Sequence, residues 1–297
     1  MPSFKSLLTD KNNRLEEIPL ALQTVVQKQQ KKIITQILSE LSQLDTINGQ
    51  IKINSKNLKL IATISDELKT IFLNDDYLSA VKEFASEFET QSILNAKIIE
   101  KGFGKTESPI ASKTYIDLAK KNAVESLINE NLFTKPIQDI LESSIVNGAS
   151  ISETIDAITL FVEGNADLDG QILKYVKQIT NDSFAIADRS YTSIVSDALD
   201  NDWFYYAGGE VRDTRCFCLE RVGRYFHYKE IESWARGENL GNCDNGGVWQ
   251  GEIKGTNEAT IYSYLGGYNC QHSLMPVSEV IVDEIDLEHA RDLGYID

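Results

Sequence analysis

The sequence predicts a mainly α protein, in which an elongated helical N-terminal region precedes a small α+β domain that contains Cys and His. Three observations lead to this prediction. Apolar residues return every three or four positions through most of residues 12–200, which is the spacing of amphipathic helices. Residues 201–270 then hold all three Trp, all four Cys and thirteen of the twenty-six aromatic residues. Short aromatic stretches bounded by Gly and Asn appear in the same part, as is typical of strands.

The first clearly periodic segment predicts a long amphipathic helix. Its apolar residues keep three- and four-residue steps, with one slip near Asn48, and form a seam like that of a short coiled coil. The seam consists of Ile34, Ile37, Leu41, Leu44 and Ile51. The same periodicity predicts two further helices over residues 58–73 and 77–99.

A linker is predicted at residues 102–109, GFGKTESP, because two Gly, one Pro and polar side chains follow one another there. Helical periodicity resumes at residues 115–132. Ser150 and Glu153 have the spacing of a capping box that opens another helix, and Asp169 begins a last long one. The predicted regions are a long-helix region at 1–103, a helical domain at 104–200, a small α+β module at 201–280 and an acidic tail at 281–297.

Three strands are predicted in the small module, at residues 203–208, 223–228 and 259–266. A module of this size has a limited hydrophobic core, and such modules often need a metal or a disulfide for stability. The Cys and His residues are therefore the candidates for that role.

The net charge of −16 argues against a protein that coats nucleic acid through its overall charge. The charge is uneven, since residues 1–60 hold nine Lys and Arg against five Asp and Glu. Lys28, Lys31 and Lys32 form a small basic cluster, which is either a solvated helix face or a contact for DNA or for an acidic partner. Residues 279–297 hold seven acids and one Arg, and form either a solvated surface or a docking strip for a basic partner.

The compartment bears on the chemistry of the cysteines. No run of about 18 apolar residues predicts a transmembrane helix, and the N-terminal residues turn polar too early for a signal peptide. Synthesis in the cytoplasm is therefore expected, where disulfides are disfavoured. Cys243 lies in the loop sequence NLGNCDNGG and is predicted to be a free surface thiol.

The remaining Cys and His residues offer pairs with the short spacing that zinc ligands favour. Cys270 and His272 form one pair, and Cys218 pairs with either Cys216 or His227. The residues alone leave several interpretations open: a structural metal, a catalytic zinc, a Cys nucleophile beside His272 or His227, a Cys218–Cys270 disulfide, or ordinary core residues. No HExxH helix supports the catalytic zinc, and no recognised nucleophile motif surrounds Cys218.

Other residues near the cysteines are predicted to brace the module. Asp213, Arg215, Glu220 and Arg221 are expected to form a partly buried ion network around the site, in which Arg215 holds a turn through bidentate hydrogen bonds. Trp234 and Trp249 are predicted to belong to the core of the module.

Two sequence blocks carry a resemblance to a known family. The first reads D-x-R-x-x-C-x-x-x-x-G, and the second is GGYNCQH followed by a Pro-Val pair. Together with the preceding helices they resemble the minor head proteins of tailed phages, the Mu head-morphogenesis (MuF-like) family, over about residues 150–280. The matching positions are Asp213, Arg215, Cys218, Gly223, Asn269, Cys270, Pro276 and Val277. The spacer before the second block looks like the versions in phages of Bacteroidetes-type hosts.

The second block departs from the family, which closes with Asn-Cys-Arg-Cys. Here Gln271 replaces the Arg and His272 replaces the second Cys. A Cys-to-His exchange keeps a zinc ligand but removes a disulfide partner, so the comparison favours a structural zinc. The expected ligands are Cys218, Cys270, His272 and His227, with Cys216 as the alternative fourth.

The resemblance implies a non-enzymatic virion protein, made in the host cytoplasm and present in multiple copies at the portal vertex. Its helical region would bind the portal protein, the major capsid protein or both, and it would aid head assembly, genome packaging or DNA delivery. The alternative is a phage-encoded effector or hydrolytic enzyme that uses the Cys/His cluster.

Overall fold

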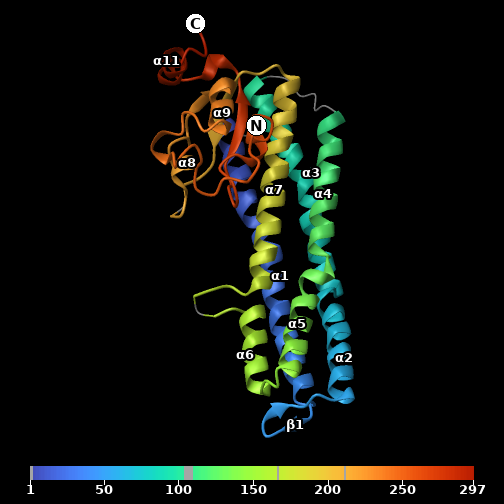
Figure 1. Ribbon diagram of the computed structural model, residues 1–297. Coiled ribbons are helices and arrows are strands. Elements are labelled where there is room, and N and C mark those ends of the chain that lie inside the picture. Colours follow the sequence, from blue (N-terminus) through green and yellow to red (C-terminus); the bar gives the residue numbers. More distant parts are fainter. Residues whose placement is uncertain (1–2, 104–109, 166, 211) are drawn as a thin grey trace. The chain divides into compact units, whose positions relative to one another are not determined.

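The computed structural model describes residues 3–103, 110–165, 167–210 and 212–297, and it confirms a mainly α fold with a small α+β region near the C-terminus (Figure 1). The helices of the first part are α1 (Phe4–Leu41), α2 (Ser55–Phe72), α3 (Asp75–Phe103), α4 (Ile110–Leu127), α5 (Thr134–Val146), α6 (Ile151–Val162) and α7 (Gln171–Ala198), with a 3-10 turn η1 (Glu130–Leu132). None of the described helices is both long enough and apolar enough to span a membrane.

The α+β region follows α7. Its strands are β3 (Trp203–Ala207), β4 (Tyr225–His227) and β5 (Ser273–Val277), and its helices are α8 (Cys216–Leu219), α9 (Tyr228–Ala235), α10 (Ile261–Tyr264) and α11 (Glu284–Asp292), with 3-10 turns η2 (Gly241–Cys243) and η3 (Glu279–Ile281). These elements occupy the orange-to-red part of Figure 1.

The chain forms two compact units, and each unit combines segments that are far apart in the sequence. Unit 1 comprises Met1–Pro19, Ser86–Asn122 and Thr180–Asp297, and unit 2 comprises Leu20–Ala85 and Ala123–Ile179. The sequence had instead predicted four successive regions. The predicted linker at 102–109 lies mostly outside the described residues.

Unit 2 is built on packed helices and one small hairpin. The ring of Phe72 on α2 stacks on that of Phe133, with ring centroids 3.9 Å apart. The long helix predicted through Ile51 is wrong in its last part, because α1 ends at Leu41 and strands β1 (Thr46–Ile47) and β2 (Gln50–Ile51) follow. Asn48 and Gly49 connect them with φ of 53° and 81°, which is the left-handed conformation that a two-residue hairpin turn requires.

Several helix boundaries agree with the sequence prediction. The capping box that opens α6 is confirmed, since the Ser150 hydroxyl accepts from the Glu153 amide and the Glu153 carboxylate accepts from the Ser150 amide. Helix α2 covers the predicted stretch 58–73 except for its last residue, and α3 covers the predicted stretch 77–99. Helix α4 differs, because it begins at Ile110 and ends at Leu127.

The sheet of unit 1 has the order β4-β3-β5, with all strands antiparallel. Strands β3 and β4 lie within the predicted stretches 203–208 and 223–228, whereas the stretch 259–266 contains the short helix α10 in place of a strand. The Asn257 side chain accepts hydrogen bonds from the backbone amides of Ala259 and Thr260 just before this helix, a turn that favours helix initiation. The third strand is β5, which contains Pro276 and can do so because it lies at the edge of the sheet.

The two faces of the sheet carry different cores. One face carries Phe204, Tyr206, Phe226 and Leu274, which share a core with Trp234 and Trp249, and the opposite face carries Trp203 and Val277. The segment predicted as an acidic tail forms α11 beside this second core. Asp286 on α11 binds Arg224 at 2.8 Å, and His289 lies 3.3 Å from the Glu230 carboxylate.

Candidate metal centre

Three of the predicted ligands, Cys218, Cys270 and His272, meet on the face of the sheet that carries Trp234. The two Sγ atoms are 3.8 Å apart, and Cys270 Sγ lies 3.8 Å from His272 Nδ1. All three side chains are buried, and their ligand atoms lie within 4.8 Å of one another. Cys218 comes from α8, whereas the other two come from the loop that leads into β5.

A buried arginine on α7 positions the second segment. Arg189 donates from Nη1 to the carbonyl of Cys270 at 2.6 Å and to that of His272 at 3.3 Å. Its Nε donates to the carbonyl of Ser263 at 2.5 Å. The sequence carries no signal for this role, because the arginine binds backbone atoms more than seventy residues away.

Gly208 and Gly266 lack side chains that would otherwise overlap with the cluster. A Cβ added at Gly266 would lie 2.5 Å from Cys218 Sγ and 2.8 Å from Cys270 Sγ. One added at Gly208 would lie 2.1 Å from Cδ2 of the His272 ring. All three distances are shorter than real contacts of a Cβ, so a larger residue at either position would displace the side chains of the cluster.

The two thiols differ in acidity because they share a hydrogen bond. That bond, with the nearby His272 and Arg189, lowers the pKa of Cys270 well below its usual value. The same bond and burial raise the pKa of Cys218. Tyr206 also donates to Cys218 Sγ at 3.3 Å. Of the two thiols, Cys270 therefore loses its proton more readily, and a bound cation would favour ionisation of both thiols.

The donor spacing fits a tetrahedral zinc ion. With Zn–S of about 2.3 Å and Zn–N of about 2.05 Å, a regular tetrahedron places two sulfurs about 3.8 Å apart and a sulfur and a nitrogen about 3.6 Å apart. The observed separations are both 3.8 Å. His272 Nδ1 is the ring nitrogen that faces Cys270 Sγ, while Nε2 is buried and makes no hydrogen bond with the described residues. The cluster can therefore bind a metal.

A cavity of about 300 Å³ adjoins the cluster, and all three candidate ligands line it. The rest of its wall is polar or glycine: Asn181, Gly209, Asp213, Thr214, Arg215, Asn269 and Gln271. Asp182, just beside this wall, accepts a hydrogen bond from the Asn269 amide, and burial raises the pKa of its carboxyl.

His227 does not join the cluster, so its prediction as a fourth ligand is wrong. It pairs with Trp203 in the sheet and lies on the face opposite to Tyr206, because successive side chains in a strand alternate between faces. Its ring contacts Trp203 and Tyr295, and its Nδ1 accepts from the Lys229 amide at the start of α9. The role of His227 is to cap a helix and fill a core.

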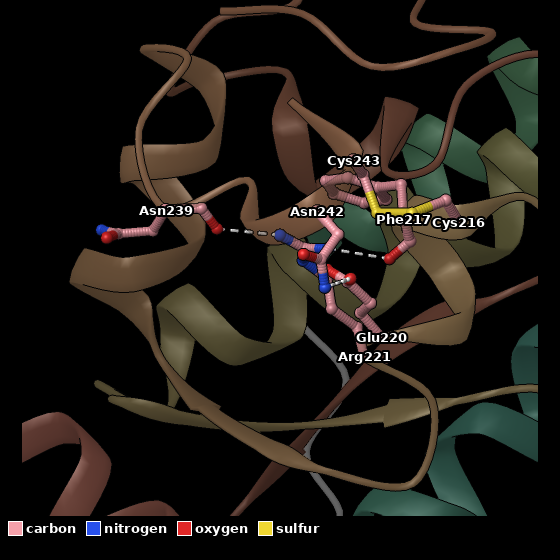
Figure 2. Close-up of a disulfide and its surroundings, with 7 residues drawn as sticks. All are labelled: Cys216, Phe217, Glu220, Arg221, Asn239, Asn242 and Cys243. Carbon is pink, nitrogen blue, oxygen red and sulfur yellow. Dashed lines mark hydrogen bonds between the residues drawn. A yellow bond between two sulfur atoms is a disulfide. The ribbon is translucent and has the colours of Figure 1, made fainter. Parts of the chain in front are cut away.

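Cys216 is also not a ligand of the cluster, because it forms a disulfide with Cys243 (Figure 2). The prediction that Cys243 is a free thiol is therefore wrong. Hydrogen bonds reinforce this connection between α8 and η2. Asn242 donates to the Glu220 carboxylate at 2.9 Å, and Arg221 donates from Nη2 to the Asn239 carbonyl at 2.9 Å.

The residues predicted to brace the module use different partners from those expected. Arg215 donates to the Gly266 carbonyl at 3.3 Å, so it holds a turn but does not form an ion pair there. Arg221 stacks on the rings of Phe217 and Trp234 and donates to the Phe217 carbonyl. Asp213 lines the cavity. Trp234 and Trp249 are buried core residues, as predicted.

The basic cluster of α1 is exposed at Lys28, Lys31 and Lys32. Lys32 lies 3.6 Å from the Asp76 carboxylate, at the start of α3.

Comparisons of the chain with protein-family models, with curated proteins and with solved structures found no match. The fold and the site therefore rest on the chain's own residues.

Proposed function

We propose that the chain is a non-enzymatic minor head protein of a tailed phage, located at the portal vertex of the virion. One observation carries this proposal: the two sequence blocks that resemble the MuF-like family close a single buried cluster. Cys218 of the first block lies 3.8 Å from Cys270 of the second. Arg215 of the first block also binds the Gly266 carbonyl at the start of the second. The shared motif thus serves to close the fold.

In this proposal a structural zinc connects the two blocks through Cys218, Cys270 and His272. The spacing of their ligand atoms suits zinc, and the module has the limited core for which a metal is a common stabiliser. The helices contact the portal protein or the major capsid protein and support head assembly, genome packaging or DNA delivery. Lys28, Lys31 and Lys32 are the side chains offered to packaged DNA.

The test is the location of the chain in purified virions of the phage that encodes it. Mass spectrometry should find the chain in DNA-filled heads in a small number of copies. A photo-crosslinker at Leu38, an exposed position on α1, should capture the portal or capsid protein. The same crosslinker at Leu219, exposed on α8, is the matched control. Absence of the chain from purified virions would contradict the proposal.

The cavity beside the cluster favours one alternative, a phage-encoded effector or hydrolytic enzyme. Cys218→Ala separates the two functions. For an enzyme, the variant keeps its fold and loses a measurable hydrolytic activity. For a structural centre, the variant loses metal and residues 201–280 lose their stability.

A further inference from the structure

We infer that the metal centre of Cys218, Cys270 and His272 keeps one coordination position open to the adjacent cavity, where a water molecule or a small anion from solution completes the tetrahedron. This inference rests on the zinc proposed above. It goes further because it assigns the fourth ligand to the solvent and not to the chain.

The described residues offer no fourth protein ligand. Among their His, Cys, Asp and Glu side chains, the group of ligand atoms within 4.8 Å of one another has three members here. His227 lies on the other face of the sheet, and Cys216 is in a disulfide. The Tyr206 hydroxyl donates a hydrogen bond to Cys218 Sγ, so Tyr206 supports a ligand and does not act as one.

The cavity supplies the missing position. All three ligands form part of its wall, so a metal between them borders the space of about 300 Å³. This volume is enough for several water molecules. Asn269 and Gln271 line the same space, and their amide side chains are of a type that can hydrogen-bond to a bound ligand.

Charge determines which ligand suits the position. Two thiolates, one neutral imidazole and Zn²⁺ have no net charge together. Arg215 lines the cavity with a permanent positive charge, while Asp213 brings a carboxylate to the same wall. The carboxylate can accept a hydrogen bond from a water molecule at the open position. The guanidinium favours a small anion there. Three protein ligands leave the proposed zinc accessible to solvent while it still connects the two blocks, and in this it differs from closed structural sites, which have four protein ligands.

The test uses cobalt(II) as a spectroscopic substitute for zinc in the full-length chain. The protein is stripped of metal under reducing conditions and titrated with cobalt(II). We expect one cobalt per chain, a thiolate-to-cobalt charge-transfer band and intense visible bands of a tetrahedral ion. Sodium azide and imidazole are then added separately. A saturable shift of the visible bands with azide supports an open position, and no shift with either ligand overturns it.

A glycine in the cavity wall provides a blocking variant. A Cβ at Gly209 would have no atom within 4 Å, so Gly209→Phe can place a ring in the cavity without a backbone clash. This variant should keep the cobalt bands and lose the azide shift. Gly209→Ala is its matched control and should keep both. An azide shift that persists unchanged in Gly209→Phe would show that the ligand binds elsewhere.

The outcomes separate this inference from the zinc proposal. A chain that binds no cobalt disproves the metal centre itself. A chain that binds cobalt and ignores azide and imidazole keeps the metal centre and disproves only its open position. Neither result depends on finding the chain in a virion.

Discussion

The ammonium group of Lys11 lies 2.7 Å from a carboxylate oxygen of Asp188, and neither side chain is exposed to solvent. Asn95 and Gln91 both donate to the other carboxylate oxygen at 2.8 Å. Burial lowers the pKa of Lys11, and Asp188 is the group that opposes this effect. The pair connects α1, α3 and α7 within unit 1.

We predict that Asp188→Asn destabilises the protein by about 3–5 kcal/mol, because it leaves the Lys11 ammonium buried without its counter-charge. Urea unfolding followed by circular dichroism measures the effect. The double variant Lys11→Met/Asp188→Asn should recover most of the lost stability, because it removes the unpaired charge and keeps an acceptor for the Asn95 and Gln91 side chains. A double variant as unstable as the single one would contradict this explanation.

The second prediction concerns Gly208 and Gly209, which are neighbours in sequence with opposite steric surroundings. Gly208→Ala should lower both the melting temperature and the metal content, because the new Cβ would meet the His272 ring at 2.1 Å. Gly209→Ala should leave both unchanged, because its Cβ would meet nothing within 4 Å. Thermal unfolding and metal analysis of the two variants in parallel test the steric requirement. Equal behaviour of the two variants would refute it.

Most helices were predictable from the sequence because local signals define them. Ser150 and Glu153 fix the start of α6 through bonds between neighbours in the chain. The hairpin at Asn48 was missed because Ile51 extended the apolar periodicity past the turn. Residues 259–266 are rich in strand-forming side chains, but the hydrogen bonds of Asn257 to following amides start a helix there.

The site was predictable only in part, for a different physical reason. Cys218, Cys270 and His272 were predicted as ligands from their residue types, their spacing and the resemblance to the MuF-like family. The spacing could not exclude His227, since only strand register places it on the opposite face. The Cys216–Cys243 pair joins residues 27 positions apart, and no short-range pattern reports such a contact. The role of Arg189 could not be predicted, because it donates hydrogen bonds to backbone carbonyls, which every residue carries.

The third prediction concerns the pH dependence of stability. Burial lowers the pKa of His227 below 6.5, against the opposing effect of Asp202. The folded state therefore resists protonation of this ring. The stability that neutral His227 contributes is fully present above pH 6.5, the ordinary pKa of a histidine. This contribution is lost as the pH falls from 6.5 through the lower pKa of the folded state. His227→Phe should reduce this loss in urea unfolding between pH 7.5 and about 5. The other two histidines are present in both proteins, so an identical pH profile for variant and parent would contradict the assignment.

The fourth prediction concerns the disulfide. Closing a loop across 27 positions should stabilise the oxidised protein by about 3–4 kcal/mol. Cys216→Ser/Cys243→Ser should therefore lower the melting temperature without reductant and match the parent protein with reductant. Alkylation of the denatured, unreduced chain should modify only Cys218 and Cys270. Modification of all four cysteines before reduction would show that the pair is not formed.

The zinc content of the purified chain tests the central claim most directly. Protein purified without chelator should contain one zinc per chain, and so should the Cys216→Ser/Cys243→Ser variant, whose changes lie outside the cluster. Cys218→Ser should contain none, because it removes one of three protein ligands. A parent protein that takes up no zinc even from excess, or a Cys218→Ser variant that retains a full equivalent, would contradict the account.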